Sequence, residues 1–384
     1  MITEVEITAV GHGGAGIGRV DGQVCFVPYG LPGDRLEVKI TRANKKMLWG
    51  EVASVLSASP DRTSPEYPGW QPSGVSTWLH FRYPAQAEWK QRIVRDCLAR
   101  IAGISDVALE WDEDPALRTG YRTRAEFHGD GKRFGFYALG SHEIVDTAQC
   151  PLCHPAMNRA LGKLRELEVK GSVTVTVNPE GEDVLVWTSF LNRKLRDRFA
   201  QSNTPRDERP PAMFLFDGVP VVNGAFSQSS LLLNRRLVSA AHEFAGDRGA
   251  VLDLYCGSGN LSLGLAERCD VLGLDHNKPA IRAARRTGRG RYENGNEARM
   301  NKELTEGAWK TVVLDPPRAG AKSLVPALAS SRAESIVYVS CDPATLARDL
   351  KGLYEGGWRI DRIRAIDLFP NTPHVETVCL LARG

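Results

Sequence analysis

Long hydrophobic runs are missing from this chain of 384 residues. No apolar stretch approaches the roughly 20 residues that a membrane-spanning helix needs, which excludes the α-helical membrane proteins. The first residues, Met1–Val10, alternate charged and apolar side chains instead of forming the apolar core of a signal peptide. The sequence therefore predicts a cytoplasmic protein that does not interact with a membrane.

Cysteine is also scarce: the chain has eight, unevenly spaced, which excludes a disulfide framework. The segment from Pro68 to Phe81 contains none at all. No internal repeat is visible. Hydrophobic residues at 42% and charged residues at 25% are typical of a soluble globular protein, and the length indicates two or three domains.

The net charge of +3 is too small to indicate nucleic-acid binding by itself, but the charges are clustered. Between Arg282 and Lys302 there are seven Lys/Arg and two Glu. Between Asn192 and Arg209 there are six Lys/Arg and three acids. Such clusters can contact phosphates, or they can be solvated helix faces and loops.

Residues 1–56 have the pattern of a small OB-like β-barrel, a fold that often binds oligonucleotides. Arg42, Lys45 and Lys46 share one loop and are positioned to contact an RNA backbone, although a purely structural barrel with a charged loop remains open. Turns rich in Gly and Pro separate the strand candidates, which are Val5–Val10, Gln23–Val27, Arg35–Ile40 and Trp49–Leu56.

Residues 57–210 are expected to form a linker, a helix and a small β-rich central region. Ser57–Ser76 is rich in Pro and Ser, and Ala85–Ala102 has the apolar spacing of a helix that Gly103 ends. Four strands are expected in two pairs, Arg122–His128 with Arg133–Tyr137, and Ser172–Val177 with Asp183–Thr188.

Residues 211–384 alternate strands and helices, which predicts an α/β fold with a doubly wound, Rossmann-like sheet. The strand candidates are Ala250–Leu254, Asp270–Leu274, Thr311–Leu314, Ile336–Val339, Arg359–Ile366 and Val375–Leu381.

The first of these strands runs into a glycine turn, Gly257-Ser258-Gly259, of the kind that lets a backbone approach a nucleotide cofactor. Asp275 ends the next strand, where a carboxylate can accept hydrogen bonds from both ribose hydroxyls. An NAD enzyme has the same layout, but Ser262 stands where its third glycine would lie. A turn for S-adenosyl-L-methionine binds no pyrophosphate, so we favour that cofactor over NAD.

Cys341 follows the strand Ile336–Val339 into a loop that faces the ligand crevice of such a sheet, which is a suitable position for a nucleophile. Glu376, in His374-Val375-Glu376, offers a carboxylate at the last strand. A nucleophile, a cofactor turn and a base in one sheet are the components of a covalent methyl transfer. Cysteines such as Cys256, Cys269 and Cys379 lie on or beside strands and are expected to be inert.

Three pieces of sequence, in order, resemble the SAM-dependent RNA 5-methyluridine methyltransferases, the class with an N-terminal TRAM barrel. They are Asp315-Pro316-Pro317-Arg318, Ser340-Cys341-Asp342-Pro343 with Thr345–Asp349, and His374-Val375-Glu376. The resemblance covers nearly the whole chain. It implies a methyltransferase sheet in residues 211–384, with rRNA or tRNA as the partner. We expect a monomer.

The resemblance also implies further cofactor contacts. Tyr255 and Asn260 would line the pocket, and Gln228, in Phe226-Ser227-Gln228, would contact SAM. Asp315 would contact substrate or cofactor. Asn296 stands where many methyltransferases have an acid that contacts the adenine, although an Asn there can equally be a turn residue.

In this family a cysteine thiolate attacks C6 of uracil and makes C5 nucleophilic toward the methyl group, after which a base removes the C5 proton. The resemblance assigns these roles to Cys341 and Glu376. Many members also hold a 4Fe–4S cluster. Gln149-Cys150-Pro151 resembles its fourth ligand, but the three upstream cysteines are missing, so we expect no cluster and no metal. A zinc site at Cys150 and Cys153 lacks a second ligand pair.

Three rival functions stay open at this point. A cytosine-C5 methyltransferase would carry its cysteine at or beside the Asp315 turn, and none lies there. A non-catalytic RNA-binding protein would not need Cys341 and Glu376. A dehydrogenase would bind NAD at the glycine turn. The sequence does not say which RNA or which uridine is modified.

Overall fold

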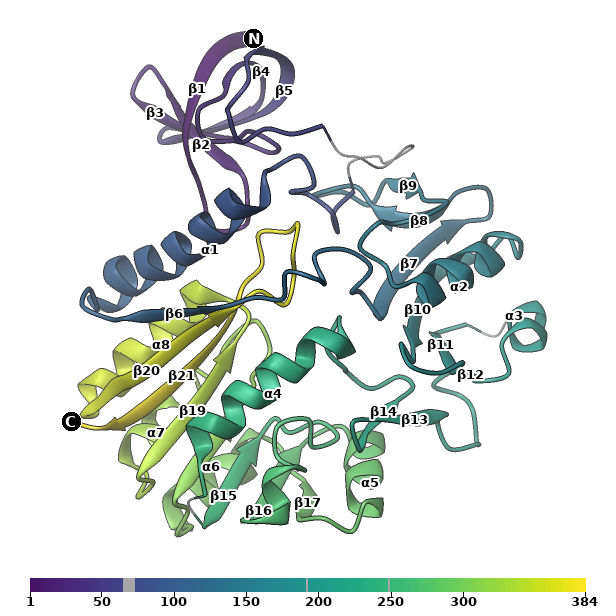
Figure 1. Ribbon diagram of the computed structural model, residues 1–384, viewed down its shortest axis with the longest axis vertical. Coiled ribbons are helices and arrows are strands. Elements are labelled where there is room, and N and C mark those ends of the chain that lie inside the picture. The colour runs from purple at the N-terminus through teal and green to yellow at the C-terminus, as the bar shows by residue number, and fades with distance from the viewer. Residues whose placement is uncertain (65–72, 191–192, 248) are drawn as a thin grey trace.

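The computed structural model describes residues 1–64, 73–190, 193–247 and 249–384. The expected linker Ser57–Ser76 and the cysteine-free segment Pro68–Phe81 fall partly outside these residues, as does Asn192. Figure 1 shows a small barrel at the N-terminal end, a mixed central region, and a large sheet flanked by helices that contains the C-terminus.

The N-terminal strands form a closed barrel in the order β1-β2-β3-β5-β4. Val5, Ile7 and Val38 point into it and are buried. Gly18 is required where β2 crosses β1, because a Cβ there would lie 2.4 Å from Val5 Cγ1. The strand ranges expected from the sequence did not include β2. The bounds are β1 Ile2–Val10, β2 Gly16–Val20, β3 Gln23–Val27, β4 Arg35–Ala43 and β5 Met47–Ser57.

The central region is a six-stranded sheet in the order β12-β11-β10-β7-β8-β9, with α2 packed on one face. Both expected strand pairs are antiparallel neighbours. A separate hairpin, β13-β14, leads toward the large sheet. The bounds are β7 Arg124–Asp130, β8 Phe134–Tyr137, β9 Ile144–Asp146, α2 Pro155–Arg165, β10 Lys170–Val177, β11 Val184–Thr188, α3 Arg193–Arg198, β12 Ser202–Asn203, β13 Met213–Phe216 and β14 Val219–Val222.

The large sheet has eight strands in the order β17-β16-β15-β18-β19-β21-β20-β6, and its doubly wound α/β arrangement is as the sequence predicts. β21 is antiparallel to both of its neighbours. The strand bounds are β6 Leu109–Asp112, β15 Ala250–Leu254, β16 Asp270–Asp275, β17 Arg291–Asn294, β18 Thr311–Leu314, β19 Ser335–Ser340, β20 Trp358–Ile366 and β21 Glu376–Arg383.

Helices cover both faces of this sheet (Figure 1). Alternate strand residues belong to different cores: Val251 packs in the core that contains α4, and Leu252 packs in the core that contains α8. The helix bounds are α4 Leu231–Ala245, α5 Lys278–Arg286, α6 Glu297–Glu306, α7 Val325–Ser330 and α8 Pro343–Glu355, with a short 3-10 turn, η2, at Leu265–Glu267.

The helix expected at Ala85–Ala102 is α1 (Tyr83–Cys97), which continues into a π-helical turn, η1, at Leu98–Ala102. Gly103 ends it with φ 73°. α1 and β6 precede the central sheet in the chain, yet α1 packs on α8 and β6 pairs with β20. Segments from before residue 113 therefore complete the C-terminal sheet. The division into domains at 56 and 210 stays a prediction.

Candidate active site

The glycine turn after β15 has a left-handed backbone at three positions: Tyr255 (φ 61°), Gly257 (φ 55°) and Gly259 (φ 86°). A Cβ on Gly259 would lie 2.6 Å from Leu263 Cγ, so no larger residue fits there. A Cβ on Gly257 would meet no atom within 4 Å, because this residue borders open space. The turn therefore exposes its backbone to a ligand.

Asp275, at the end of β16, lies beside this turn and holds it. Its Oδ2 accepts a hydrogen bond of 2.9 Å from the Gly257 N–H, and its Oδ1 accepts one of 2.7 Å from the Asn277 N–H. Both strands are parallel, so their carboxyl ends meet at one edge of the sheet. The carboxylate thus lies at the ligand edge, as the sequence predicts.

A cavity of about 680 Å³ opens at this edge. Eight of the nine residues that the sequence singled out line it: Gln228, Tyr255, Gly257, Asp275, Asn296, Asp315, Cys341 and Glu376. They come from segments up to about 150 residues apart, which the strand order brings together. A cavity of this size falls within the range of small-molecule sites.

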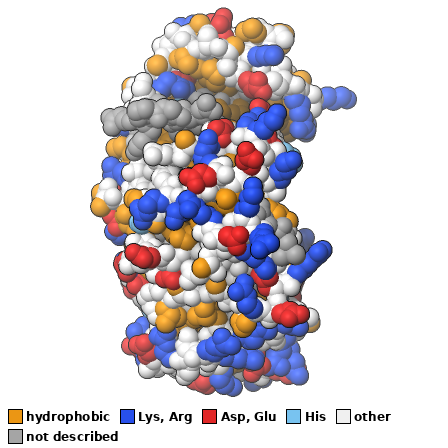
Figure 2. All heavy atoms as spheres, turned by 90° about the vertical axis from the view of Figure 1, so that its right-hand side faces the viewer, with side chains coloured by type: hydrophobic (Ala, Val, Ile, Leu, Met, Phe, Trp, Pro, Cys, Tyr) orange, Lys and Arg blue, Asp and Glu red, His pale blue; other side chains and the backbone are white. Residues whose placement is uncertain are grey.

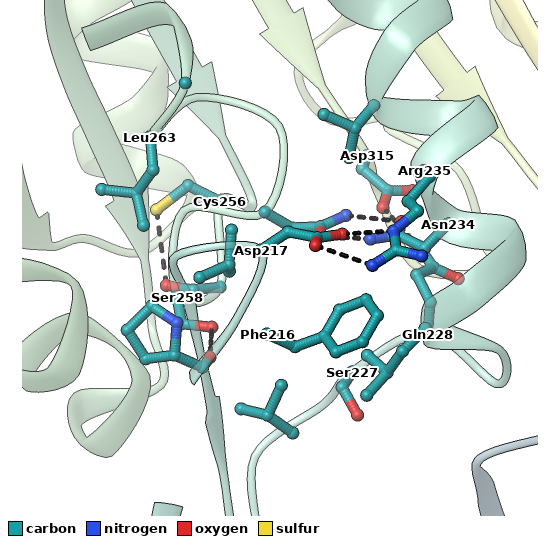
Figure 3. Close-up of a pocket in the computed structure, with 18 of the residues that line it drawn as sticks. Phe216, Asp217, Ser227, Gln228, Asn234, Arg235, Cys256, Ser258, Leu263 and Asp315 are labelled. Carbon is teal, nitrogen blue, oxygen red and sulfur yellow. Dashed lines mark hydrogen bonds and ion pairs between the residues drawn. The ribbon is translucent and has the colours of Figure 1, made fainter. Parts of the chain in front are cut away.

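The ninth residue, Asn260, lines a neighbouring cavity of about 500 Å³, shown in Figure 3. Its side chain exchanges two hydrogen bonds with Asn234 of α4, at 2.8 and 3.1 Å. Gln228 and Asp315 line both cavities. Figure 3 shows Arg235 turned toward Asp217, with which it forms an ion pair of 2.7 Å. Tyr255 and Gly257 line both cavities as well, so Asn260 lies in a cavity that adjoins the first one and shares part of its lining.

Cys341 and Glu376 stand side by side because of the antiparallel pairing of β19 and β21. The two strands end their pairing at Ser340 and Thr377; Cys341 directly follows Ser340, and Glu376 directly precedes Thr377. The Glu376 side chain is deeply buried, with the residue 2% exposed, and its Oε1 has no hydrogen-bond partner among the described residues. An unpaired buried carboxyl oxygen in a cavity is available to a ligand.

The cavity favours the neutral forms of Glu376, Asp315 and Cys341. The pKa of Glu376 is raised well above its usual range, first by burial and then by Asp315, while Arg318 lowers it. The pKa of the Cys341 thiol is raised to about 12 by burial, by Glu376 and by Asp315, again against Arg318. In the free protein these contributions favour the thiol form of Cys341 over the thiolate.

Asp315 directly follows β18 and precedes two prolines that make a stiff turn. One of its oxygens, Oδ2, accepts a hydrogen bond of 3.3 Å from Gln228 Nε2. Burial raises the pKa of Asp315 to about 7. Arg318 Nη2 lies 3.5 Å from His374 Nε2, so the guanidinium is also at the cavity.

Tyr255 and Asn296 have structural partners as well as positions in the cavity. The Tyr255 hydroxyl donates to Glu297 Oε1 at 3.0 Å. Asn296 caps α6 by accepting from the Arg299 N–H at 3.1 Å. Asn296 thus has a structural role as the N-cap of α6 and also lines the cavity, and its contact with the adenine stays a prediction. The sequence did not single out other lining residues, among them His276, Asn277, Glu297, Met300 and Phe369.

Cys150 and Cys153 are both buried, and a hydrogen bond between them lowers the pKa of Cys150. Within residues 1–64, 73–190, 193–247 and 249–384, no group of three or more His, Cys, Asp or Glu could hold a metal ion. In the same part of the chain, no helix is long and apolar enough to cross a membrane.

A doubly wound sheet with a glycine turn after one strand and a carboxylate at the end of the next is the fold of a Rossmann-like cofactor-binding domain, and here it is joined to a small closed barrel. Comparisons with known proteins refine this class. Residues 2–53 match the TRAM domain model, and residues 219–306 and 292–384 match the model of tRNA (Uracil-5-)-methyltransferase.

Two similar relatives are named 23S rRNA (uracil(1939)-C(5))-methyltransferase RlmD. The protein of Thiobacillus denitrificans is 31% identical over 99% of this chain and 99% of its own length. That of Chromohalobacter salexigens is 30% identical over 99% of this chain and 89% of its own. The solved structure of Pyrococcus abyssi tRNA (uracil-54, C5)-methyltransferase in complex with S-adenosyl-L-homocysteine is 26% identical, covers 99% of both chains and has a TM-score of 0.77.

The chain belongs to the TRAM-containing RNA uracil-C5 methyltransferases, and it is an enzyme of that family. This confirms the family resemblance that the sequence motifs carry.

Proposed function

We propose that this protein transfers a methyl group from S-adenosyl-L-methionine to C5 of a uridine in rRNA or tRNA, through a covalent bond between Cys341 Sγ and C6 of the base. The observation that carries the proposal is the single cavity that Cys341 and Glu376 share with Asp275 and Gly257. Because all four residues line one cavity, a cofactor bound at the glycine turn and a uridine between Cys341 and Glu376 can meet there.

The turn and its surroundings fit the cofactor. The exposed backbone at Gly257 leaves room for a ligand, and the buried carboxylate of Asp275 is a suitable acceptor for ribose hydroxyls. Gln228, Tyr255, Asn296 and Asp315 surround the same space, and Asn260 contributes from the adjoining cavity. When bound, S-adenosyl-L-methionine supplies an electrophilic methyl group.

Different residues of the cavity carry out the successive steps of the reaction. Cys341 gives its proton to solvent, and Sγ bonds to C6 as the C5–C6 π electrons move to C5 and the C4 oxygen. C5 then bonds to the methyl carbon, and the bond from that carbon to the cofactor sulfur breaks, which leaves S-adenosyl-L-homocysteine. Glu376, in its ionised form, accepts the proton of C5, and the electrons of that C–H bond restore the C5–C6 double bond as Sγ leaves. Sγ leaves as a thiolate and takes a proton from solvent, and Glu376 releases the proton of C5 to solvent, so both side chains return to their starting forms.

Arg42 lies near the end of β4 and not in the loop that the sequence predicts, while Lys45 and Lys46 lie between β4 and β5. The barrel is proposed to bind RNA with these three side chains against phosphates. These side chains are exposed, and the Arg42 guanidinium lies 4.4 Å from the Trp49 ring centroid. Lys and Arg side chains are also spread across the face shown in Figure 2, among acids. We propose that the protein acts as a monomer in the cytoplasm.

The test is methyl transfer to RNA taken from cells that lack this protein. With methyl-labelled S-adenosyl-L-methionine, the expected product after nucleoside digestion is 5-methyluridine. Mapping the label along the RNA then identifies the molecule and the position. Label in 5-methylcytidine would contradict the choice of base, and no label in any RNA would contradict the function.

A further inference from the structure

A nine-residue loop, 367–375, joins β20 to β21 and leads directly into Glu376. Its first residue, Asp367, follows Ile366, which is the partner of Glu376 across the two strands. Any displacement at Asp367 is therefore transmitted to the pair that places Glu376. The contacts that hold this loop decide how firmly Glu376 is held.

Those contacts come from α1, about 280 residues earlier in the chain. Lys90 Nζ donates to Asp367 Oδ1 at 2.7 Å and to the Phe369 carbonyl at 3.0 Å. The Tyr83 hydroxyl donates to Asp367 Oδ2 at 2.7 Å. The side chains of Lys90 and Asp367 are both 0% exposed. Burial lowers the pKa of Lys90, and the charge of Asp367 acts against this.

The middle of the loop is held by the same helix. Gln86 Nε2 donates to Asn371 Oδ1 at 3.0 Å, and the Asn371 N–H donates to Gln86 Oε1 at 3.0 Å. Asn371 has φ 62°, a left-handed conformation that needs such support. The Trp78 N–H donates to the Asn371 carbonyl at 3.1 Å.

The barrel reaches the two loops that flank the cavity. A Cβ on Gly14 would lie 2.7 Å from Pro373 Cβ, so the β1–β2 turn is in close contact with the 367–375 loop. His12 Nε2 lies 3.1 Å from Asp342 Oδ2, next to Cys341. The N-terminal part of the chain thus packs against the elements that present both reactive side chains.

A buried ion pair costs desolvation and adds little net stability, but the loss of one partner leaves an uncompensated charge. Lys90 also holds a backbone carbonyl, which a simple charge pair does not require. We therefore expect the Lys90–Asp367 pair to fix the position of the 367–375 loop more than it stabilises the fold.

We propose that Lys90 is a positioning residue for the methylation reaction: by holding Asp367 and the Phe369 carbonyl, it sets where Glu376 meets the C5 proton. This rests on the proposed function, in which Glu376 is the base. Loss of Lys90 then affects proton removal rather than Cys341 attack or methyl transfer, because Cys341 belongs to another loop.

The experiment compares full-length Lys90→Met with Glu376→Gln and with Arg95→Met, which removes an exposed cation from the same helix. Each variant receives RNA from cells lacking this protein and methyl-labelled S-adenosyl-L-methionine. The readouts are turnover, cofactor affinity, and labelled protein–RNA adduct on a denaturing gel. For Lys90→Met we expect kcat to fall about 10- to 100-fold, the scale of a small misplacement of a catalytic group.

We further expect Lys90→Met to accumulate labelled adduct, as Glu376→Gln does, with cofactor affinity unchanged and Arg95→Met equal to the native protein. A fall in turnover without adduct, while Glu376→Gln gives adduct, would overturn the role of Lys90 alone. Absence of adduct in Glu376→Gln would instead count against the proposed function.

A second variant distinguishes a positioning role of Lys90 from a general loss of folded protein. Lys90→Met/Asp367→Asn removes both buried charges, so its melting temperature should exceed that of Lys90→Met. The double variant still lacks the hydrogen bond from Lys90 Nζ to the Phe369 carbonyl. We therefore expect it to accumulate more protein–RNA adduct than the native protein does. If turnover returns to the native value together with the melting temperature, Lys90 has a structural role only and the inference is wrong.

Discussion

The backbone N–H of Gly257 donates to Asp275 Oδ2 over 2.9 Å, and this bond ties the cofactor turn after β15 to the end of β16. One carboxylate thereby shapes the turn and faces the cavity that Gly257 also lines. Turn geometry and cofactor affinity are therefore expected to depend on the same side chain.

Asp275→Ala should weaken S-adenosyl-L-methionine binding by about 1.5–3 kcal/mol, the scale of hydrogen bonds to a charged group. Isothermal calorimetry measures this directly. Asp270→Ala, at the exposed start of the same strand, is the matched control and should bind as the native protein does. Equal affinity of Asp275→Ala and the control would remove Asp275 from the site.

Protein purified without oxygen should be colourless and free of iron–sulfur absorbance. The reason is the absence of cysteine from Pro68 to Phe81, which leaves Cys150 without three partner ligands. Iron and sulfide analysis gives the answer, and stoichiometric amounts of both would contradict the expectation.

The triple variant Arg42→Gln/Lys45→Gln/Lys46→Gln should bind RNA more weakly and with a shallower salt dependence. Each lost phosphate contact lowers the slope of log K against log salt by about 0.7–0.9, so three contacts give about 2–3. Fluorescence anisotropy across a salt series measures the slope. Lys351→Gln, an exposed cation on α8, controls for net charge. Identical slopes for all proteins would exclude these three residues from the RNA interface.

Glu376→Gln should stabilise the free protein at neutral pH but not at pH 4. The folded-state pKa of Glu376 is raised well above the usual range, so the folded protein keeps a proton that the unfolded chain releases above a pKa of about 4.3. Stability is then lost as the pH rises from that value toward the folded pKa, by up to about 1.4 kcal/mol per pH unit.

Glutamine does not titrate and escapes this loss. Thermal denaturation from pH 4 to pH 8 compares the two proteins. A constant difference in melting temperature across the range would show that Glu376 is already ionised in the fold.

Much of the cavity could be predicted from the sequence because short-range rules apply to it. Glycines after a strand, an acid at the end of the next strand, and a cysteine after a third strand all meet at one edge of a parallel sheet. Eight of the nine residues named in advance lie there together. Asn260 lies in the adjoining cavity because the left-handed residues of the turn direct it toward Asn234.

The remaining features depend on contacts that no local pattern contains. The Lys90–Asp367 pair joins residues 277 positions apart, and Lys90 lies on a helix whose apolar spacing predicts only packing.

β17 (Arg291–Asn294) falls in a segment dominated by charge. Ion pairs there, such as Arg291 with Asp270 and Arg299 with Glu303, favour a solvated face over a phosphate site. The pKa of Cys341 is likewise raised by burial and then by Glu376 and Asp315, which come from other segments of the chain.

The most direct test of the central claim is the fate of the Cys341–uridine bond in Glu376→Gln. With RNA from cells lacking the protein and methyl-labelled S-adenosyl-L-methionine, this variant should accumulate a denaturation-resistant protein–RNA complex that carries one methyl group, because attack and methyl transfer proceed while proton removal stalls. Cys341→Ala should give neither complex nor product. Methylation by Cys341→Ala, or a Glu376→Gln protein that never forms the complex, would contradict the covalent mechanism.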